Sequence, residues 1–477
     1  MADVQAVRER LEAAGVRYVF GAYTDLNGVP KSKCVPLAHL ESMARGSELY
    51  TVGALEGMGK LGPNEDECVS VPDLDTFTVL PWDPKYALAA TDLHFHGQPY
   101  SHDPRRVLRR QVEEAAAMGY RLDMGVEPEV YVLRQVDGDW RPFVAEDLDN
   151  LPTRGYDLEA TIQAEPFLDP MVTYMNQLGW DVFSFDHEGG DGQYEFDFGY
   201  TDALAMADRM VVFRLMAKHV ARTLGCIATF MPKPWSQAFG SGAHYNLSLA
   251  DPASGRNLFE VEGAGPGTDE ADRRPDRGFT ELAYQFTAGV LEHAGAITAV
   301  VCPTVNSYKR MLPRGLMNEI SWAPVYRAYG HNNRTLMCRL PMNRRCLELR
   351  IADSACNFYL GAAITLAAGL EGVQRRLKAG DPLNVDTYSV SEGDLEAAGV
   401  RRVPANLGEA VAEFEAEPND TIVQATTMAP DGDGFTSAGR LVQLDYDFFR
   451  IRVTGDPQLW LIEVTGDSAP TVDLLDV

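Results

Sequence analysis

The chain has 477 residues, and 42 basic against 69 acidic side chains give it a formal charge of −27. This length suits two or three domains. A content of 45% hydrophobic and 23% charged residues is a normal globular balance, which excludes disorder over most of the chain. The surplus of acid excludes a nucleic-acid partner and docking on anionic lipid, because both need basic surface. Nucleotides remain open, since a divalent cation can bridge phosphate and carboxylate.

The sequence carries no signal for a membrane span or for export. No run of about 18 apolar residues is present, and the opening M-A-D-V-Q-A-V-R-E-R-L-E is polar and amphipathic. The cysteines are scattered, odd in number and without C-x-x-C pairs: Cys34, Cys68, Cys226, Cys302, Cys338, Cys346 and Cys356. We therefore predict a reduced, cytoplasmic protein without a zinc site.

Residues 1–103 are predicted to form a small, sheet-rich domain. A helical pattern over 1–14 ends at Gly15, and residues 17–25 alternate as in a strand. Asn27-Gly28 is a hairpin signal, and K-S-K-C-V-P supplies the returning strand. Short strands with proline-rich turns follow.

Residues 104–416 are predicted to form a larger domain that mixes helices and strands. Apolar periodicity predicts helices at 105–118, 169–178, 201–224, 279–298 and 358–379, and strands at 126–133, 227–231, 243–249 and around 335–352. These elements do not follow a regular βαβ alternation. The expected fold class is therefore α+β.

The last segment, 417–477, differs in composition. It has no lysine, and eleven acidic residues against three arginines give it −8 of the total charge of −27. Its text alternates as in strands, for example R-L-V-Q-L-D-Y-D-F-F-R-I-R-V and L-W-L-I-E-V. We predict a separate all-β piece near the lower size limit for an independent fold.

Two glutamates stand in G-V-E-P-E-V-Y-V, at 125–132. Glu127 and Glu129 are two residues apart on a predicted strand, so both side chains point to one face. Like charges on a half-buried face repel each other unless a cation lies between them. The alternative is a solvated strand edge.

Two further segments supply acidic and imidazole groups. In F-D-H-E-G-G-D-G-Q-Y-E-F, Glu188 and Glu195 flank a Gly-rich turn that can fold both carboxylates toward one point. The alternative is an acidic surface hairpin. In G-S-G-A-H, Gly240 begins a loop that precedes His244 on an alternating strand. The alternative for His244 is a histidine with satisfied hydrogen bonds in the core.

Several arginines surround one more glutamate. The segments at 306–310, 332–341 and 344–353 bring to Glu348 the side chains of Arg310, Arg334, Arg339 and Arg350. Arginine forks suit phosphate and carboxylate recognition, although structural salt bridges are the alternative. Five glutamates with one histidine favour Mg²⁺ or Mn²⁺. Enzymes that transfer a phosphoryl group from ATP use such cations together with arginines.

Six motifs, in order, resemble the glutamine synthetase family over about residues 16–416. They are G-V-E-P-E, H-E-x-x-x-G-Q-x-E, A-T-F-M-P-K-P-…-G-S-G-A-H, P-T-V-N-S-Y-K-R, N-N-R-T and L-E-L-R-I-A-D-…-N-F-Y-L. Their spacing is most similar to the type III branch, near the γ-glutamylmethylamide synthetases. The tail is similar to part of a bacterial pre-peptidase C-terminal β-sandwich.

The family resemblance implies an N-terminal β-grasp domain and a catalytic domain with an antiparallel sheet and flanking helices. It implies homo-oligomeric rings with active sites between subunits. One metal would be held by Glu129, Glu188 and Glu195, and the other by Glu127, His244 and Glu348. Gly240 would lie against the amino acid, Arg310 and Arg350 would bind glutamate carboxylates, Arg334 and Arg339 would face the transferring phosphate as catalytic residues, and Ser248 with Arg339 would bind ATP.

The implied activity is an ATP-dependent glutamate–ammonia ligase. The γ-carboxylate of glutamate takes the γ-phosphoryl group, and an amine then displaces phosphate from the acyl phosphate. Two alternatives are a γ-glutamyl-alkylamide synthetase that uses methylamine or another amine, and a non-catalytic binding or regulatory relative.

Some substrate positions depart from the family pattern. Phe239 stands where many synthetases have asparagine, Asn246 replaces the second histidine of H-x-H, and Cys346 replaces an arginine near ATP. No clear ammonium-pocket aspartate occurs near 47–58, and Glu319 does not have the spacing of the flap glutamate. Loss of anionic groups weakens selection for a small cation, so the acceptor is hypothesised to be an alkylamine.

Overall fold

The computed structural model describes most of the chain. The described residues are 3–417 without 56, 60, 63, 144–154, 266–267, 269–272 and 313–321, together with the backbone of 450–453 and 462–465. Within these ranges, no helix is long and apolar enough to cross a membrane. Glu319 lies outside the described residues.

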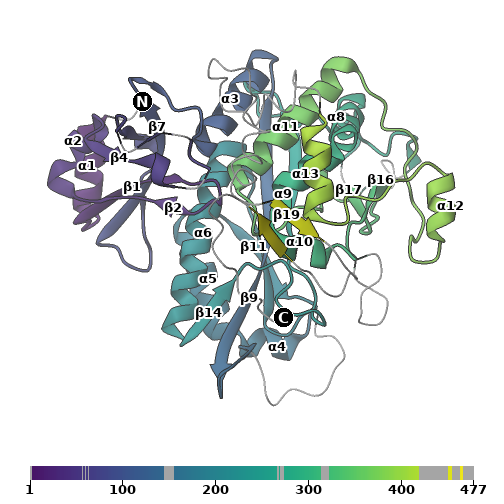
Figure 1. The fold of residues 1–477 in the computed structure, drawn as a ribbon, viewed down its shortest axis with the longest axis horizontal. Helices are drawn as coiled ribbons and strands as arrows, with labels where there is room; N and C mark the ends of the chain where they lie inside the picture. Colours follow the sequence, from purple (N-terminus) through teal and green to yellow (C-terminus); the bar gives the residue numbers. More distant parts are fainter. Residues whose placement is uncertain are drawn as a thin grey trace.

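The N-terminal part is built on an eight-stranded sheet with the order β2-β1-β7-β5-β4, to which β3, β6 and β8 add (Figure 1). The strands are β1 Tyr18–Thr24, β2 Pro30–Lys31, β3 Cys34–Pro36, β4 Glu48–Tyr50, β5 Cys68–Pro72, β6 Thr78–Val79, β7 Tyr86–Phe95 and β8 Gln98–Pro99. The helices are α1 Val4–Ala13 and α2 Leu40–Ala44, with short 3-10 turns at Leu37–His39, Val52–Ala54 and Leu74–Thr76.

Local sequence explains the first elements. The Asp3 side chain caps α1 by accepting from the backbone N–H of Gln5, and Gly15 follows the helix with φ of 79°. The predicted hairpin is confirmed, because β1 pairs antiparallel with β2 and Gly28 has φ of 70° in the turn.

The larger part is built on a ten-stranded sheet with the order β11-β12-β9-β15-β18-β17-β16, to which β10, β13 and β14 add through β9. Its strands are β9 Arg121–Val136, β10 Asp139–Pro142, β11 Val182–His187, β12 Gln193–Phe198, β13 Thr201–Asp202, β14 Cys226–Thr229, β15 Ala243–Ala250, β16 Tyr326–His331, β17 Leu336–Leu340 and β18 Leu347–Leu349. Apart from the parallel pair β16–β17, these strands pair antiparallel. The α+β prediction is confirmed.

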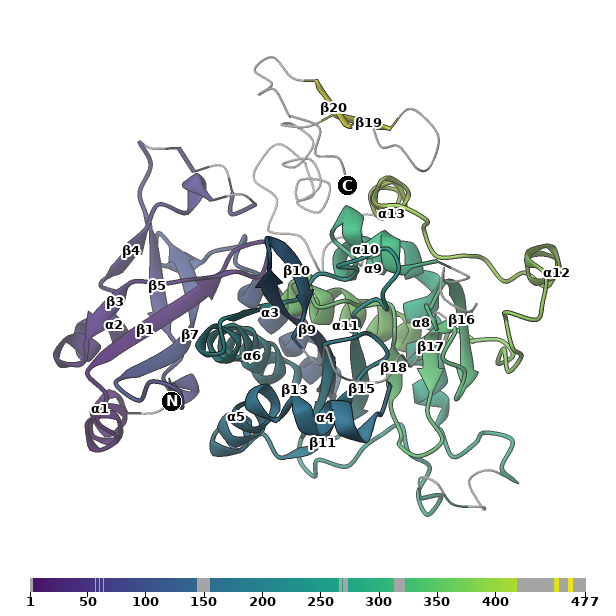
Figure 2. The ribbon, with the colours of Figure 1, turned by 90° about the horizontal axis from the view of Figure 1, so that it is seen from below.

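Helices surround this sheet. They are α3 Pro104–Ala117, α4 Leu158–Gln163, α5 Glu165–Gln177, α6 Ala203–Thr223, α8 Glu281–Glu292, α9 Ala294–Val301, α10 Val305–Arg310, α11 Phe358–Arg375, α12 Glu392–Ala397 and α13 Leu407–Glu415. Figure 2 shows α3, α6 and α11 beside β9 and β15. The predicted helix over 279–298 is two helices that meet at His293, and the one over 358–379 ends at Arg376, which has φ of 51°.

Strand β9 sets the position of the site because its two faces differ. The even positions Leu122, Met124, Val126, Val130 and Val132 belong to the main hydrophobic core. The alternation of a strand therefore directs the odd positions, which include Glu127 and Glu129, to the opposite face.

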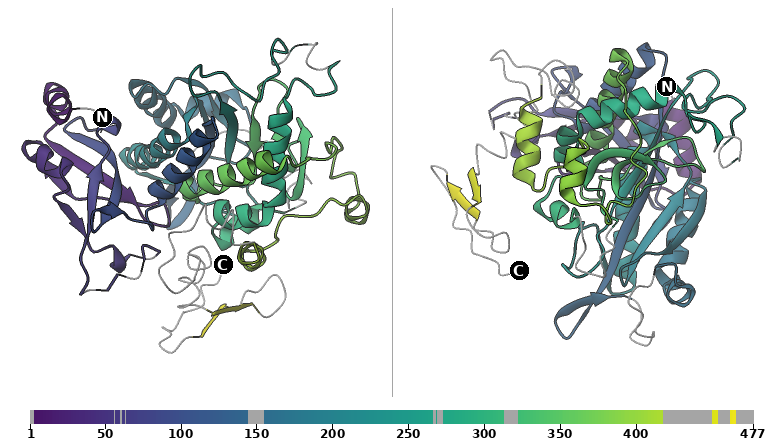
Figure 3. Two further views of the ribbon diagram at one scale, coloured as in Figure 1. Left: turned by 90° about the horizontal axis from the view of Figure 1, so that it is seen from above. Right: turned by 90° about the vertical axis from the view of Figure 1, so that its right-hand side faces the viewer.

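A buried arginine joins the N-terminal sheet to helix α6 of the larger part; the two sheets lie side by side in Figure 3. Arg105, at the start of α3, is 2% exposed. Its guanidinium lies 3.1 Å from Asp73 and 2.8 Å from Asp92 of the N-terminal part, and 2.9 Å from Asp208 of α6. The Arg105 guanidinium thus contacts three carboxylates that come from distant segments of the chain.

The described part of the C-terminal segment consists of two strands. β19 Arg450–Val453 pairs antiparallel with β20 Ile462–Thr465. The rest of the predicted all-β piece beyond residue 417 lies outside the described residues.

Candidate active site

Strand register lines the predicted groups up across the large sheet. Glu129 of β9 pairs with Glu195 of β12. Glu127 of β9 pairs with His244 of β15. On the far side of β15, Glu348 of β18 pairs with both Asn246 and Arg339. Motifs separated by more than two hundred residues therefore form one continuous row.

Carboxylates gather at the β12 side of this row. Glu129, Glu188 and Glu195 each offer one oxygen, and these atoms all lie within 4.8 Å of one another. Burial and the nearby Glu188 carboxylate raise the pKa of Glu129 to about 8. Burial and the charges of Glu188 and Glu127 hold the pKa of Glu195 well above its usual value. One buried and two half-buried carboxylates at this spacing need a cation to be ionised together.

A second group of possible metal ligands adjoins the first. Glu127, Glu195 and His244 offer atoms within 4.8 Å of one another, so Glu195 belongs to both groups. Burial, together with the positive charge of Arg350, lowers the pKa of His244 to about 4. The imidazole is therefore neutral at pH 7, as a metal ligand must be. Carboxylate oxygens with one imidazole nitrogen fit Mg²⁺ or Mn²⁺.

Neutral donors orient Glu129. Its Oε2 accepts from the Gln193 side-chain amide at 2.9 Å and from the Gly242 N–H at 2.9 Å. Gln193 also donates to the carbonyl oxygen of Gly240 at 3.0 Å. Sequence reasoning did not assign Gln193 a role, although it lies inside the H-E-x-x-x-G-Q-x-E motif.

Glu348 lies in a different environment. It is fully buried, and its carboxylate accepts from Arg339 at 2.6 Å and from Arg350. Burial acts to raise its pKa, yet Arg350, His244 and Arg339 together bring that pKa to about 2. Among the described residues, neither group of possible metal ligands includes Glu348. The structure therefore places it with the arginines, and its predicted metal role stays a prediction.

The G-S-G loop lies tightly against the site. A Cβ on Gly240 would come within 2.6 Å of the Arg310 side chain, and one on Gly242 would come within 2.9 Å of Nε2 of His244. The Arg310 guanidinium donates to the carbonyl oxygens of Ile351 at 2.9 Å and Arg350 at 2.8 Å. Glycine is needed in this loop because any side chain would displace Arg310, His244 or Glu129.

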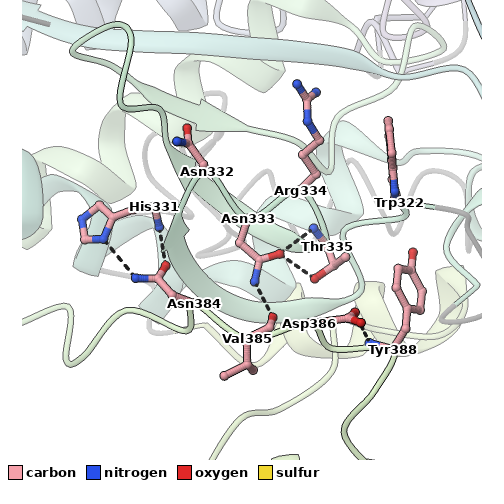
Figure 4. A pocket seen from close by; sticks show the side chains of 10 residues that line it. All are labelled: Trp322, His331, Asn332, Asn333, Arg334, Thr335, Asn384, Val385, Asp386 and Tyr388. Atoms are coloured by element: carbon pink, nitrogen blue, oxygen red, sulfur yellow. Dashed lines mark hydrogen bonds between the residues drawn. The ribbon is translucent and has the colours of Figure 1, made fainter. Parts of the chain in front are cut away.

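A cavity of about 390 Å³ opens next to Arg334 (Figure 4). The Arg334 guanidinium lies 5.6 Å from the centre of the Trp322 ring, a cation–π distance. The Arg334 carbonyl accepts from Nε of Arg350 at 3.0 Å, and Arg339 donates to the Asn332 side chain at 3.4 Å. The three arginines predicted from N-N-R-T through L-E-L-R are thus brought together.

The positions that depart from the family pattern lie around the same row. Asn246 donates to Oε1 of Glu127 at 3.0 Å, and the Cys346 thiol donates to the Asn246 side chain at 3.4 Å. The Phe239 ring lies against Gly189, where an added Cβ would be 3.0 Å from it. Ser248 is on β15 four residues beyond His244, on the same face but opposite Asp123.

The comparisons with known proteins agree with this geometry. Residues 101–428 match the model of the glutamine synthetase catalytic domain. The chain belongs to the glutamine synthetase family. It is an ATP-dependent carbon–nitrogen ligase of the glutamine synthetase type.

Individual relatives of this ligase cover nearly its whole length. A glutamate–methylamine ligase of Methyloversatilis universalis is 37% identical over 432 residues, which is 90% of this chain and 93% of that protein. A glutamine synthetase of Rhizobium meliloti is 34% identical over 400 residues, covering 84% and 87%. The solved structure "GmaS/ADP complex-Conformation 1" superposes with a TM-score of 0.80 at 33% identity, covering 94% of this chain and 95% of that one.

Proposed function

We propose that this ligase joins the γ-carboxylate of glutamate to a small primary alkylamine such as methylamine, with ATP as the source of the activating phosphoryl group. The observation that carries the reaction type is the row of carboxylates, histidine and arginines across one face of the large sheet. The similarity to a glutamate–methylamine ligase supports the choice of acceptor.

The predicted metal ligands fit the proposal. Glu129, Glu188 and Glu195 would hold one Mg²⁺ or Mn²⁺, and Glu127 and His244, with Glu195 shared and Glu348 close by, would hold another. When bound, such cations neutralise phosphate oxygens and make phosphorus easier to attack. The neutral Gln193 amide and Gly242 N–H keep Glu129 in one orientation without competing for charge.

The arginines supply the remaining positive charge. Arg334 and Arg339 are the proposed catalytic residues that stabilise the phosphoryl group as it moves from ATP to the glutamate γ-carboxylate. Arg310 and Arg350 would bind glutamate carboxylates beside Gly240, and Ser248 with Arg339 would contact ATP. The Glu348 carboxylate fixes the forks of Arg339 and Arg350, so both are oriented before substrate arrives.

The acceptor amine would arrive beside an aromatic ring. Phe239 lies against Gly189, which directly follows the acidic Glu188 in the chain and donates to it at 3.1 Å. A methyl group gains free energy on leaving water for such a ring, about 0.8 kcal/mol for a buried methylene-sized group. The ring face attracts ammonium and methylammonium alike as cations, so the methyl contact is what distinguishes the two.

A panel of amines tests the acceptor. We expect the ratio kcat/KM for methylamine to exceed that for ammonia, with phosphate release that depends on glutamate, ATP and Mg²⁺ or Mn²⁺. Clear preference for ammonia would favour the second candidate, a glutamine synthetase, which the 34% identity to such enzymes supports. No turnover with any amine would favour a non-catalytic relative.

Assembly into homo-oligomeric rings, with active sites between subunits, is part of the same proposal. So is the division into an N-terminal domain (1–103), a catalytic domain (104–416) and a tail (417–477). Light scattering of the full chain and of a version ending at residue 416 tests both. Unchanged ring size and activity in the shorter chain would show that the tail is dispensable.

A further inference from the structure

Arg344 is held differently from the other arginines of the row. Its Nη2 donates to Oε1 of Glu127 at 2.7 Å and lies 3.6 Å from the Glu348 carboxylate. Its buried Nε has no hydrogen-bond partner. The side chain is 37% exposed, against 11% for Arg339 and 5% for Arg350. Of the three arginines that contact Glu127 or Glu348, it is therefore the one that can leave its partner most easily.

The next residue shows that this placement is particular to Arg344. Arg345 is 3% exposed, donates to the carbonyl oxygen of Met342 at 2.9 Å, and lies 5.0 Å from the centre of the Phe279 ring. Arg345 thus has a structural role. Arg344 is directed to the carboxylates.

Glu127 is the group for which Arg344 and a metal ion would compete. Its Oε1 accepts from Arg344 and Asn246, and its Oε2 lies 3.4 Å from Nδ1 of His244. The same carboxylate belongs to the group of possible metal ligands with Glu195 and His244. A carboxylate that coordinates a divalent cation binds a guanidinium less strongly, even through its other oxygen, because the two positive charges repel.

We propose that Arg344 is a resident counter-ion of the site: it occupies Glu127 until a divalent cation arrives, and the released guanidinium then binds the phosphates of the nucleotide. The proposal rests on the proposed function for the identity of that nucleotide. A planar fork is well suited to phosphate oxygens. Arg344 would also supply the positive charge that Cys346, two positions away, does not.

Direct binding measurements on the full-length protein test the proposal. Mn²⁺ is titrated without nucleotide, followed by electron paramagnetic resonance, into the wild type, Arg344→Gln and Arg344→Lys. We expect Arg344→Gln to bind Mn²⁺ about 3- to 10-fold more tightly, with Arg344→Lys in between. At saturating Mn²⁺, a non-hydrolysable ATP analogue should bind Arg344→Gln about tenfold more weakly. Arg256→Ala, which also removes one exposed positive charge, is the matched control.

The possible outcomes distinguish the counter-ion role, the phosphate-binding role and the proposed function from one another. Unchanged or weaker Mn²⁺ binding by both Arg344 variants, with normal binding by the wild type, overturns the counter-ion role. Tighter Mn²⁺ binding with unchanged affinity for the ATP analogue overturns the phosphate-binding role. A wild type that binds no Mn²⁺ and shows no turnover overturns the proposed function itself. Thermal melts of each variant show whether it is folded.

Discussion

Two clusters of partly or fully buried carboxylates in this ligase differ in how the protein balances their negative charge. In the cluster around Arg105, burial acts to raise the pKa of Asp73, but the charges of Arg105 and Arg109 outweigh burial and hold that pKa below its usual value. For Asp208 in the same cluster, burial is the stronger effect and the pKa is raised. In the proposed active site, burial and mutual repulsion raise the pKa values of Glu129, Glu188 and Glu195. The first cluster carries its own cation and joins the N-terminal sheet to α3 and α6. The second cluster carries negative charge that the protein does not balance, which suits a metal ion.

The same contrast occurs within the active site. Glu348 is paired with arginines and has a pKa of about 2, whereas Glu129 has a pKa of about 8. A carboxylate that is compensated by the protein contributes to structure. A carboxylate that is left uncompensated marks the place of a ligand. Substitutions in each cluster should therefore have opposite effects on stability and activity.

Glu129→Gln should have the largest effect on activity. We expect turnover to fall by about 1,000-fold or more, because a proposed metal ligand is lost. The melting temperature without metal should stay equal or rise, since a repelling carboxylate is removed. Mn²⁺ should raise the melting temperature of the wild type but not that of this variant. Near-normal turnover in this variant would mean that the metal assignment is wrong; Glu113→Gln, at an exposed carboxylate on α3, is the control.

Arg105→Leu should have the largest effect on stability. Removing the shared cation leaves the partly buried Asp208 without its arginine partner, although Asp92 keeps its contact with Arg109 at 3.0 Å. The loss should lower the free energy of unfolding by about 3–5 kcal/mol. Denaturant titration measures it. Arg106→Leu removes a neighbouring exposed pair with Glu113 and should change the same quantity by less than about 0.5 kcal/mol. Equal stability of the two variants would contradict a structural role for the cluster.

Glu348→Gln should destabilise the protein, unlike Glu129→Gln. Arg339 and Arg350 would lose the buried carboxylate that accepts from both, at a cost of about 2–4 kcal/mol. The comparison of metal-free melting curves for the two glutamine variants decides this. If the Glu348 variant is as stable as the Glu129 variant, then pairing with arginines does not distinguish Glu348 from Glu129 in its contribution to stability.

Asp103→Asn should have the smallest effect, visible in the pH dependence. Burial and the charge of Asp92 raise the pKa of Asp103 to about 7. The folded protein therefore keeps a proton that the unfolded chain releases, so the stability of wild type relative to the variant should fall by about 1 kcal/mol or more as pH rises from 5 to 7, then level off above pH 8. Denaturant unfolding at several pH values tests this; parallel curves for the two proteins would refute it.

Much of the fold could be predicted because local signals were strong. Period-two alternation placed Glu127 and Glu129 on one strand face, and glycines with positive φ end the first helix at Gly15 and form the hairpin turn at Gly28. The break at His293 was missed because apolar periodicity continues from α8 into α9. β9 begins earlier than predicted because the polar Arg121 and Asp123 pair with each other at 2.7 Å on it.

The site was harder to predict where it depends on tertiary packing. Nothing local distinguishes Arg344 from Arg345, because this segment has no regular periodicity that assigns faces. The pairing of Arg105 joins residues 32 and 103 positions apart, which no motif reports. Glu348 was predicted to lie among four arginines, but sequence could not tell that Arg339 and Arg350 donate to its carboxylate while Arg310 donates to backbone carbonyls.

The central position of β9 has a consequence for the order of events during folding. Glu127 meets partners 119 and 217 residues away, and Glu129 meets one 64 residues away. Contacts so distant in sequence close late, because each closes a long loop at an entropic cost. The capacity to bind a divalent cation should therefore appear only when the central strands have paired. The time at which a refolding sample begins to bind Mn²⁺ would then report when the sheet is complete.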